Sequence, residues 1–467
     1  MILIFILYFV TRLYNLSLLP ITSDEANYIF WAKQIAVTNH GWFITLTAGK
    51  PPLFLWLIVL FLKFLPWNFY LIAGRLPSVT AGFFSLIAIY KLTFYLFKST
   101  RIAKLSALLY ILTPFILFYD RMAFYDSLLT ATTLWSVYFL LSKNLVAWVI
   151  TLGFALLSKP TAILFWAIEP LIYLTKFGWY RRNLIIVALV LIFSQLIHNS
   201  LIFSRGYHDY ITRAFGYTPN SQDILLSPLF LFQKNILDSI SWSTSFITWP
   251  IILSGLIGLI LLFRQSRKIS LILISLWVIP ILFLSFLGRI YFPRYFLFST
   301  PYLLIAAASF LEKKTLLTIL VLVIALQFDF LLLTNPPSAP LPEIEGWQYV
   351  SGYPSSYGFD PIYKYLDNSL KKGPVTLFVE GSFSHFPHAF DLYYWGNPNI
   401  KIYERWPLVK IDEQMYAAAK TSQVFVVARY NVRATDEFDV IKNLPLKILV
   451  EGKKPRGPDS VFLTTFN

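Results

Sequence analysis

The stretch from Thr22 to Pro52 carries the residue types that acid–base chemistry requires. It opens with two adjacent carboxylates, Asp24 and Glu25, and it ends with Lys50 in front of two prolines. Ionisable groups beside an apolar segment are costly to bury and usually have a function, and a carboxylate placed there can act as a general base. A structural alternative stays open, because Thr22-x-x-Glu25 is a capping box. Capping explains Glu25 better than it explains Asp24.

A second acidic stretch runs from Asp120 to Asp126 and is expected at the same surface as the first. Asp120 could pair with the adjacent Arg121, and Asp126 precedes a helical run that it could cap. Two acidic loops at one surface can also converge on a cleft, where acid–base groups are usually assembled. We therefore take Asp24 and Asp126 as candidate catalytic residues, with Glu25, Asp120 and Arg121 as candidate supporting residues.

Cationic residues are expected at the same surface. Lys50 precedes two prolines, Lys159 precedes Pro160 in a short turn, and Arg294 is followed by Tyr295. Each of them alone fits an interface residue whose charged end reaches toward water. Together they suit an anionic head group such as a phosphate, which Arg binds with two parallel hydrogen bonds. Lys50, Lys159, Arg294 and Tyr295 are therefore the candidate phosphate-binding residues.

The elements that position these residues must lie in a membrane. The sequence is 57% hydrophobic, 18% aromatic and 13% charged, with a mean hydropathy of +0.62. One soluble core cannot enclose so much apolar surface, so the composition predicts a polytopic, all-α membrane domain. The absence of cysteine excludes a disulfide framework, a thiolate nucleophile and a cysteine metal site.

About eleven spans are expected, since a span takes roughly 20 apolar residues. The first segment lacks the basic leader and cleavage site of a signal peptide, so we expect it to be an uncleaved span. Residues 23–37 and 51–67 are expected as helices in the membrane interface. The apolar segments are 2–19, 70–97, 104–119, 127–142, 145–157, 161–176, 183–203, 247–263, 270–287, 296–310 and 315–333.

The charges predict an orientation. The net charge is +15, and the basic surplus lies within residues 1–333, whereas residues 334–467 hold equal numbers of acidic and basic side chains. This pattern is typical of orientation by positive cytoplasmic loops and not of nucleic-acid binding. We expect a multi-pass plasma-membrane protein with its acidic loops outside the cytoplasm. The basic residues of alternate loops are Lys91, Lys98, Arg101 and Lys104; Lys143; Lys176, Arg181 and Arg182; Arg264, Arg267 and Lys268; and Lys313 and Lys314.

The composition changes at a Pro-rich linker, residues 334–345, which separates the membrane domain, residues 1–333, from a tail, residues 346–467. Strand-like runs at 375–379, 424–428, 447–450 and 461–465 alternate with helix-like stretches in the tail, which predicts a small extracytoplasmic α/β domain. Its many aromatic side chains could stack on sugars or could anchor the domain to the membrane half.

The candidate residues lie in motifs that, in their order over residues 1–310, resemble the protein O-mannosyltransferase and lipid A aminoarabinose transferase superfamily. The tail resembles those of uncharacterised prokaryotic members. The motifs are Asp24-Glu25, Gly49-Lys50-Pro51-Pro52-Leu53, Arg75-Leu76-Pro77-Ser78, Arg121 to Asp126, Leu157-Ser158-Lys159-Pro160 and Arg294-Tyr295, with Tyr349-Val350-Ser351-Gly352-Tyr353-Pro354-Ser355-Ser356-Tyr357-Gly358 in the tail.

The resemblance implies a C-type glycosyltransferase fold and a polyprenyl-phosphate sugar donor bound at the outer face. It implies that Asp24 is the base, that Asp126 is a second essential carboxylate, and that Lys50 and Arg294 contact the phosphate. Gly49 stands where several relatives carry an acid, which leaves a metal site there without one of its ligands. No metal-ligand residue or cofactor is therefore assigned, and a divalent metal stays an open alternative.

The chemistry of such a transfer fits these residue types. A base must take the proton of the acceptor hydroxyl, and cations must stabilise the charge that grows on the departing phosphate. One carboxylate with a Lys/Arg cluster is sufficient, and direct displacement predicts inversion at the anomeric carbon. The acceptor, whether lipid, glycan or protein, is left open. The alternative function is a transporter or flippase for a lipid-linked or small anionic substrate, for which Glu169, followed by Pro170 inside a span, is the best feature.

Overall fold

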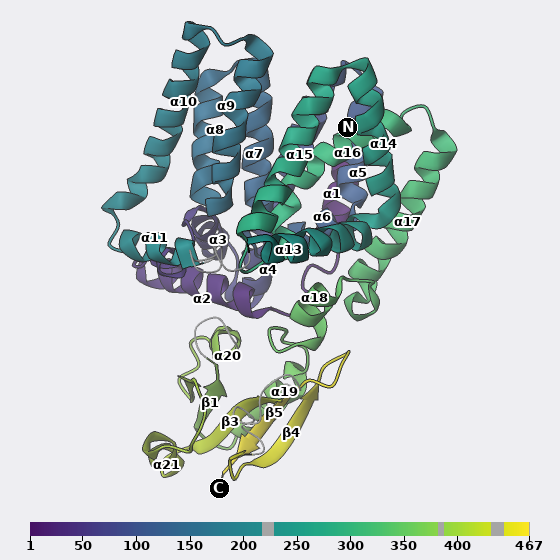
Figure 1. Cartoon of the computed structure of the whole chain (residues 1–467). Coiled ribbons are helices and arrows are strands. Elements are labelled where there is room, and N and C mark those ends of the chain that lie inside the picture. The colour runs from purple at the N-terminus through teal and green to yellow at the C-terminus, as the bar shows by residue number, and fades with distance from the viewer. Residues whose placement is uncertain (217–227, 382–386, 431–442, 467) are drawn as a thin grey trace. The chain divides into compact units, whose positions relative to one another are not determined.

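The computed structural model describes residues 1–216, 228–381, 387–430 and 443–466, which divide into two compact units (Figure 1). Unit 1 comprises Met1–Leu16, Ile35–Phe64 and Arg75–Asn335. Unit 2 comprises Ser17–Gln34, Leu65–Gly74 and Pro336–Asn467. The division after Asn335 lies inside the expected linker. Two short N-terminal segments, however, belong with the tail.

Unit 1 is helical. The helices are α1 (Ile2–Leu13), α3 (Leu53–Phe64), α4 (Tyr70–Phe97, which begins in unit 2), α5 (Thr100–Leu112), α6 (Pro114–Asp120), α7 (Tyr125–Ser142), α8 (Leu145–Ser158), α9 (Ile163–Phe177), α10 (Arg181–Asn199), α11 (Tyr207–Gly216), α13 (Pro228–Trp242), α14 (Trp249–Gln265), α15 (Arg267–Leu287), α16 (Thr300–Leu311) and α17 (Thr315–Thr334). Short turns of helix are η1 (Ile44–Ala48), η3 (Pro160–Ala162), η4 (Ser200–Phe203), η5 (Ser243–Thr248) and η6 (Pro293–Ser299).

Length and composition qualify six described helices as membrane spans, or seven if one bent pair counts as a single span. Three shorter apolar helices, α1, α3 and α8, add to the hydrophobic mass. The protein is therefore a multi-pass membrane protein, as its composition predicts. The number of about eleven spans stays a prediction, because several apolar segments form helices shorter than the roughly 20 residues of a perpendicular crossing.

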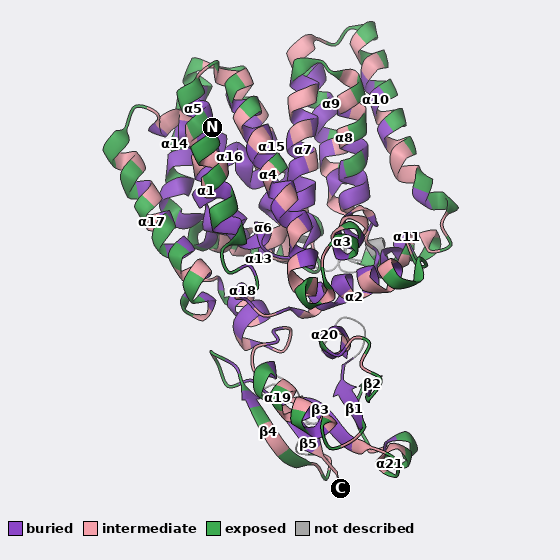
Figure 2. Ribbon diagram, turned by 180° about the vertical axis from the view of Figure 1, so that it is seen from behind, coloured by how far each residue is buried: buried purple, intermediate pink, exposed green. Residues whose placement is uncertain are grey.

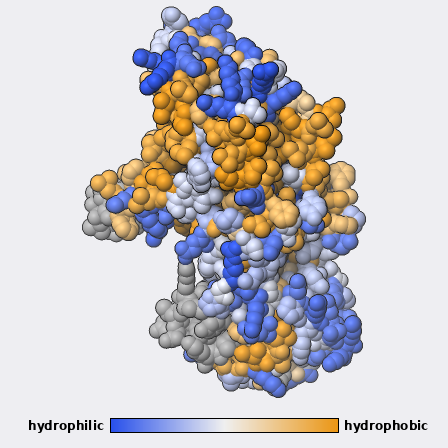
Figure 3. Space-filling view, turned by 90° about the vertical axis from the view of Figure 1, so that its right-hand side faces the viewer, coloured by the Kyte–Doolittle hydropathy of each residue, from blue (hydrophilic) through white to orange (hydrophobic). Residues whose placement is uncertain are grey.

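The surface of unit 1 is apolar where lipid would lie. Large hydrophobic side chains are exposed along α10 and α17, including Phe193 and Phe330, and Figure 3 shows apolar side chains gathered over the flank of this unit. The α9–α10 and α14–α15 connections, which carry basic residues, lie at the end of the helices opposite to α11 and α13 (Figure 1). This arrangement fits the loop alternation used to predict the orientation.

The interior of unit 1 forms around α5, α14 and α16, which are buried along much of their length (Figure 2). Gly258 of α14 lies against α16 so closely that a Cβ atom there would stand 2.1 Å from the carbonyl oxygen of Ala306. Small residues allow helix backbones to approach one another, and in lipid this packing replaces the hydrophobic driving force between helices. Gly258 is thus required by the packing.

One expected span is broken. Residues 104–119 were expected to be continuous, but α5 ends before Thr113 and α6 begins at Pro114, with a bend of 64° between them. Proline lacks an N–H and disfavours the helical conformation of the residue before it, so the helix stops at Thr113. Pro114 then occupies the first turn of α6, where its missing donor does no harm. Helix α6 then ends at Asp120, and a short turn connects it to α7, whose first turn contains Asp126.

Unit 2 contains a five-stranded mixed sheet with the order β2-β1-β3-β5-β4. Strand β1 pairs in parallel with β2 and β3, whereas β5 runs antiparallel to β3 and β4. The sequence predicted four of the five strands and missed β2, whose charged residues suit an exposed sheet edge. The strands are β1 (Val375–Glu380), β2 (Ile400–Arg405), β3 (Gln423–Tyr430), β4 (Lys447–Lys453) and β5 (Ser460–Thr465).

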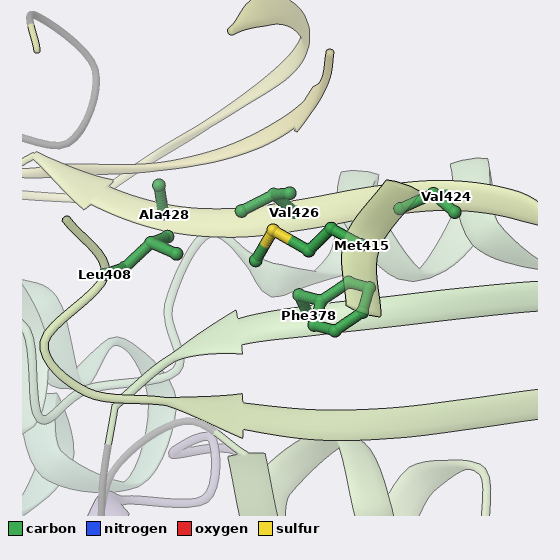
Figure 4. Close-up of a cluster of buried hydrophobic side chains, with 6 residues drawn as sticks. All are labelled: Phe378, Leu408, Met415, Val424, Val426 and Ala428. Atoms are coloured by element: carbon green, nitrogen blue, oxygen red, sulfur yellow. The ribbon is translucent and has the colours of Figure 1, made fainter. Parts of the chain in front are cut away.

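Helices cover this sheet and join it to the N-terminal segments of the same unit. One core cluster lies on the sheet, where Met415 of α21 packs on Phe378 of β1 and Val426 of β3 (Figure 4). The other elements of unit 2 are α2 (Ser23–Thr38, whose last residues belong to unit 1), η2 (Trp67–Phe69), η7 (Pro336–Ser338), α18 (Glu343–Gly346), η8 (Trp347–Ser351), α19 (Phe359–Leu370), α20 (Pro387–Tyr393) and α21 (Glu413–Ala419).

Candidate active site

Asp126 lies in the first turn of α7 and is buried, with 3% of its side chain exposed. It does not cap the helix, because the capping position is Phe124 and no side chain accepts a hydrogen bond there. Instead, its Oδ1 atom lies 2.5 Å from Nζ of Lys159, which ends α8 immediately before Pro160. The two residues that the sequence predicted in separate loops therefore form an ion pair.

Arg294 and Tyr295 reach the same place from η6. Nζ of Lys159 lies 4.3 Å from the centroid of the Tyr295 ring. The guanidinium carbon of Arg294 lies 4.8 Å from the ring centroid of Phe124 and 5.9 Å from that of Tyr295. Aromatic faces attract cations in this way. Pro293 in the first turn of η6 fixes the backbone that presents Arg294.

Lys50 lies near the first residue of α7. Its Nζ atom lies 5.9 Å from the ring centroid of Tyr125, the residue before Asp126, and Phe54 packs on the same ring at 4.9 Å. Gly49 has φ 69° and ends η1 in the left-handed region, which favours glycine over any residue with a Cβ. The local backbone therefore accounts for glycine at the position before Lys50.

Together these residues form what we call the α7 cluster: Lys50, Phe124, Tyr125, Asp126, Lys159, Arg294 and Tyr295, all in unit 1. It contains three cations and one carboxylate, so positive charge is in excess among its members. Aromatic rings lie beside each cation. Such a cluster can bind an anion and stabilise negative charge that develops on it.

Asp24 and Glu25 lie in unit 2, at the start of α2. Glu25 is fully buried, and its Oε2 atom accepts hydrogen bonds from the backbone N–H of Thr22 at 3.2 Å and from its hydroxyl at 3.4 Å. Glu25 thus reaches back to the residue before the helix, as a capping box does. Asp24 lies in the same first turn and is half-buried. Its role as the base stays a prediction.

Asp120 and Arg121 do not pair with each other, which corrects the ion pair considered from their adjacency. Asp120 is buried and pairs with Arg12 of α1 at 3.3 Å, and Ser127 donates a hydrogen bond to its Oδ1 atom at 3.0 Å. The guanidinium of Arg121 donates to the backbone carbonyls of Thr11, Arg12, Tyr14 and Asn15 at 2.7–2.9 Å.

These two contacts have a structural consequence. The last carbonyls of a helix have no partner within it and carry partial negative charge, so a cation placed on them stabilises the helix end. Arg121 does this for α1, and the Asp120–Arg12 pair joins α1 to α6. Both residues therefore fix the chain that leads from α1 toward α2. The sequence motifs did not identify Arg12 as the partner of Asp120, although a single charge within an apolar segment indicates a specific partner.

Glu169, the residue that most favoured a transporter, is engaged in helix packing. Its Oε2 atom accepts hydrogen bonds from the hydroxyl of Ser136 at 2.7 Å and from Nε1 of Trp148 at 2.5 Å. These contacts join α9 to α7 and α8.

Within residues 1–216, 228–381, 387–430 and 443–466, no three His, Cys, Asp or Glu side chains stand close enough to hold a metal ion.

Comparisons with known proteins add to this geometry. Residues 49–201, which contain Lys50, Asp126 and Lys159, match the family model "Dolichyl-phosphate-mannose-protein mannosyltransferase". The fold is similar to that of ArnT from Cupriavidus metallidurans bound to undecaprenyl phosphate, with a TM-score of 0.61 and 12% identity over 99% of this chain and 96% of that one. The apo form of the same protein gives a TM-score of 0.57 and 13% identity over 100% and 97%.

No curated protein sequence matches the chain. At 12–13% identity the structural similarity establishes the fold and leaves the chemistry to be argued from the site. The similarity covers nearly the whole of both chains, including the C-terminal sheet domain. The chain thus has the C-type glycosyltransferase fold, and its resemblance to the protein O-mannosyltransferase and lipid A aminoarabinose transferase superfamily is confirmed.

Proposed function

We propose that the protein is a membrane glycosyltransferase that takes a sugar from a polyprenyl-phosphate donor and transfers it, with inversion, to an acceptor hydroxyl. The observation that carries this proposal is the α7 cluster, in which three cations and a carboxylate converge from four separate segments. The matched family model and the ArnT-like fold support it, because the former names a dolichyl-phosphate sugar and the latter was solved with undecaprenyl phosphate.

The α7 cluster suits a phosphate that gains charge. A sugar-linked lipid phosphate is a diester with one negative charge, and the departing lipid phosphate carries more. Lys159 is oriented by Asp126 at 2.5 Å, so the ammonium group is fixed before a substrate arrives. Arg294 offers a planar guanidinium that can donate two parallel hydrogen bonds to phosphate oxygens. Preorganised cations of this kind lower the barrier by stabilising charge in the transition state.

The reaction requires one base. Asp24 takes the proton of the acceptor hydroxyl, the hydroxyl oxygen forms a bond to the anomeric carbon, and the bond between that carbon and the phosphate oxygen breaks. The electron pair of the broken bond leaves with the phosphate, next to Lys50, Lys159 and Arg294. Because the oxygen attacks opposite to the phosphate, the configuration inverts. A phosphate leaves without a strong acid, so a second carboxylate is needed only to orient Lys159.

The distribution of basic residues supports an extracytoplasmic site for this chemistry. Basic residues near the junction of α9 and α10 lie at the end of these helices opposite to α11 and α13, and positively charged loops favour the cytoplasmic side. The acidic loops and the C-terminal domain then face the outside of the plasma membrane. The acceptor is a lipid, glycan or protein hydroxyl that reaches that side.

Purified protein in proteoliposomes with a panel of radiolabelled undecaprenyl-phosphate hexoses and pentoses tests the proposal. We expect at least one donor to release undecaprenyl phosphate and to label an acceptor in added membranes of the source cells. Asp24→Asn should reduce this transfer to a small residual rate while the protein stays monodisperse. Full activity of Asp24→Asn would remove its role as the base. Movement of intact donor across the bilayer without release of undecaprenyl phosphate would instead support the transporter alternative.

A further inference from the structure

The conspicuous Tyr349–Gly358 segment of the tail has no part in the chemistry described so far. In the structure its first residues lie in the π-helical turn η8, its end leads into α19, and it belongs to unit 2, as does the start of α2. Thr22 and Ser355 form an antiparallel bridge, and the backbone N–H of Ser23 donates to the carbonyl of Pro354 at 2.9 Å. Residues far apart in sequence are thereby joined at the base of α2.

The hydrogen bond from Ser23 is placed at a vulnerable point of the helix. Ser23 is the first residue of α2, and the first N–H groups of a helix have no acceptor within it. The Pro354 carbonyl supplies one acceptor, and the carboxylate of Glu25 supplies another for the N–H of Thr22. Both contacts lie within two residues of Asp24. They fix the direction in which the first turn of α2 begins.

The segment that supplies the Pro354 carbonyl is itself held by a buried lysine. Nζ of Lys454, which directly follows β4, donates to the carbonyl of Ser355 at 2.5 Å, and only 7% of Lys454 is exposed. Burial lowers the pKa of Lys454 to about 7, and the charge of Asp459 opposes this shift. Burying an ammonium group is costly unless it gains a specific partner, and here that partner is the residue that pairs with Thr22.

A second cation holds the other side of the segment. The guanidinium carbon of Arg429 lies 4.6 Å from the ring centroid of Tyr353, the residue before Pro354. The carboxylate of Glu380, buried at the end of β1, accepts from Nε of Arg429 at 3.3 Å and from its backbone N–H at 2.9 Å. The sheet thus orients Arg429, and Arg429 orients Tyr353.

The end of the segment is fixed by close backbone contact. Gly358 has φ 88°, and a Cβ on Gly452 of β4 would lie 2.0 Å from the carbonyl oxygen of Gly358. Only glycine fits at both positions, because the first needs a left-handed conformation and the second leaves no room for a side chain. The segment is therefore tied to β1, β3 and β4 along its length and has little freedom of its own.

We propose that Tyr353, Pro354 and Ser355, held by Arg429 and Lys454, are a positioning element that sets the first turn of α2 and with it the carboxylate of Asp24. The inference rests on the proposed role of Asp24 as the base. We call Thr22, Ser23, Pro354 and Ser355 the α2 clamp. The C-terminal domain then takes part in catalysis without contacting the reacting atoms, because it sets the geometry of the residue that does.

The expected signature is a loss of turnover without a loss of donor affinity. A displacement of about 1 Å can lower a rate roughly a hundredfold when a reacting group must be aligned. The cations assigned to the donor phosphate belong to unit 1, whereas the α2 clamp belongs to unit 2. Disturbing the α2 clamp should therefore lower kcat and leave the KM for the donor nearly unchanged.

Ser23→Pro tests the hydrogen bond directly. Proline is well tolerated at the first position of a helix and prefers an extended residue before it, as Thr22 is in its bridge. The substitution removes the N–H that Pro354 accepts and keeps the helix. Ser23→Ala removes the side chain but retains the N–H. We expect kcat of Ser23→Pro to be about ten- to a hundredfold below that of Ser23→Ala, with donor KM within about twofold. The probe is the undecaprenyl-phosphate sugar that turns over in the panel above.

Lys454→Met tests the support behind the α2 clamp, and the exposed neighbour Lys453→Met is its matched control. In hydrogen–deuterium exchange of the full-length protein in detergent, we expect faster exchange of the amides of residues 22–30 in Lys454→Met than in Lys453→Met. The kcat of Lys454→Met should fall as well. In an Asp24→Asn background, neither Ser23→Pro nor Lys454→Met should lower residual turnover by more than about twofold, since positioning an absent base has no effect.

The outcomes separate the two claims. If Asp24→Asn keeps full activity, the proposed function fails, and the exchange experiment still measures whether the α2 clamp exists. If Asp24→Asn is inactive while Ser23→Pro and Lys454→Met match their controls in exchange and kcat, the α2 clamp is overturned and the proposed function stands. An equal loss from Ser23→Pro in the presence and absence of the Asp24 carboxylate would also overturn it, because the effect would then be merely structural.

Discussion

Two buried ion pairs lie on either side of the turn between α6 and α7, and they differ in what surrounds them. The Arg12–Asp120 pair is sealed, with exposed fractions of 0% and 1%, and its remaining hydrogen bonds go to backbone carbonyls, Ser127 and Tyr8. The pair itself contains one positive and one negative charge. A pair of this kind joins helices and has no capacity left for a ligand.

The Lys159–Asp126 pair is built differently. Lys159 is 16% exposed, and two more cations of the α7 cluster lie beside aromatic rings next to the pair. The carboxylate orients one cation, and the cluster as a whole contains three cations and one carboxylate. The comparison teaches that an ion pair alone says little about function, whereas its exposure and the side chains beside it help to distinguish a helix joint from a candidate anion site.

Breaking the Arg12–Asp120 pair should give the largest effect, which is a loss of stability. Arg12→Met leaves the Asp120 carboxylate buried without its cation, which typically costs about 3–5 kcal/mol. We expect a strong drop in Tm, measured by tryptophan fluorescence in detergent, and loss of the monodisperse fraction. Adding Asp120→Asn to Arg12→Met should restore part of the stability. An unchanged Tm in Arg12→Met would show that this pair does not join the helices.

Removal of the Lys159–Asp126 pair should lower turnover more than it lowers stability. Lys159→Met combined with Asp126→Asn removes both charges, so that no buried carboxylate is left alone. We expect turnover to fall about 10²–10³-fold, as for the loss of a group that stabilises transition-state charge, with a smaller drop in Tm than Arg12→Met causes. Release of undecaprenyl phosphate in proteoliposomes measures the first quantity. Equal losses of Tm in this double variant and in Arg12→Met would contradict the proposed difference between the two ion pairs.

Two arginines sharpen the comparison further. Arg294→Lys keeps the charge but loses the planar group that stacks and forms paired hydrogen bonds, so turnover should fall about tenfold with Tm nearly unchanged.

Arg121→Lys loses most of the four carbonyl contacts at the end of α1, so Tm should fall by a few degrees, ~2–4 °C per kcal/mol of lost stability. If Arg121→Lys instead lowered turnover per folded molecule, Arg121 would belong with the α7 cluster.

Lys454 is a buried cation of the C-terminal sheet domain, and its pH-dependent effect on Tm should be the smallest of the effects predicted. Its pKa is lowered to about 7 in the folded state, whereas an unfolded lysine keeps its ordinary value of 10.5. Between these values the unfolded chain binds more protons, so stability rises with pH in this window and the penalty is complete below pH 7. The Tm of the wild type relative to Lys454→Met should therefore increase from pH 7 to 10 and stay level below pH 7. A constant difference would contradict the low pKa.

Much of the helical unit could be predicted because its signals are local. Helix α2 was expected at 23–37 and is found at Ser23–Thr38, and Asp126 and Lys159, which were expected in two separate loops, form an ion pair. Four strands were found from their β-branched runs. Strand β2 was missed because Lys401, Glu404 and Arg405 give it the composition of a surface loop.

What the sequence did not reveal depends on contacts between distant residues. The sequence left open a pairing of Asp120 with its neighbour Arg121, but in the fold Asp120 pairs with Arg12 of another helix. Likewise, the bridge between Thr22 and Ser355 leaves no periodic pattern in either segment, because a backbone hydrogen bond places no demand on side-chain type. Such pairings can be seen only once the chain is folded.

The same bridge has a consequence for how the protein is made. Thr22 is synthesised before Ser355, which lies beyond the apolar helix α17. Until Ser355 has been synthesised, the first turn of α2 lacks its distant bridge partner. If the α2 clamp positions Asp24 as proposed, an incomplete chain that ends before Ser355 has an unpositioned base and therefore a low rate of transfer.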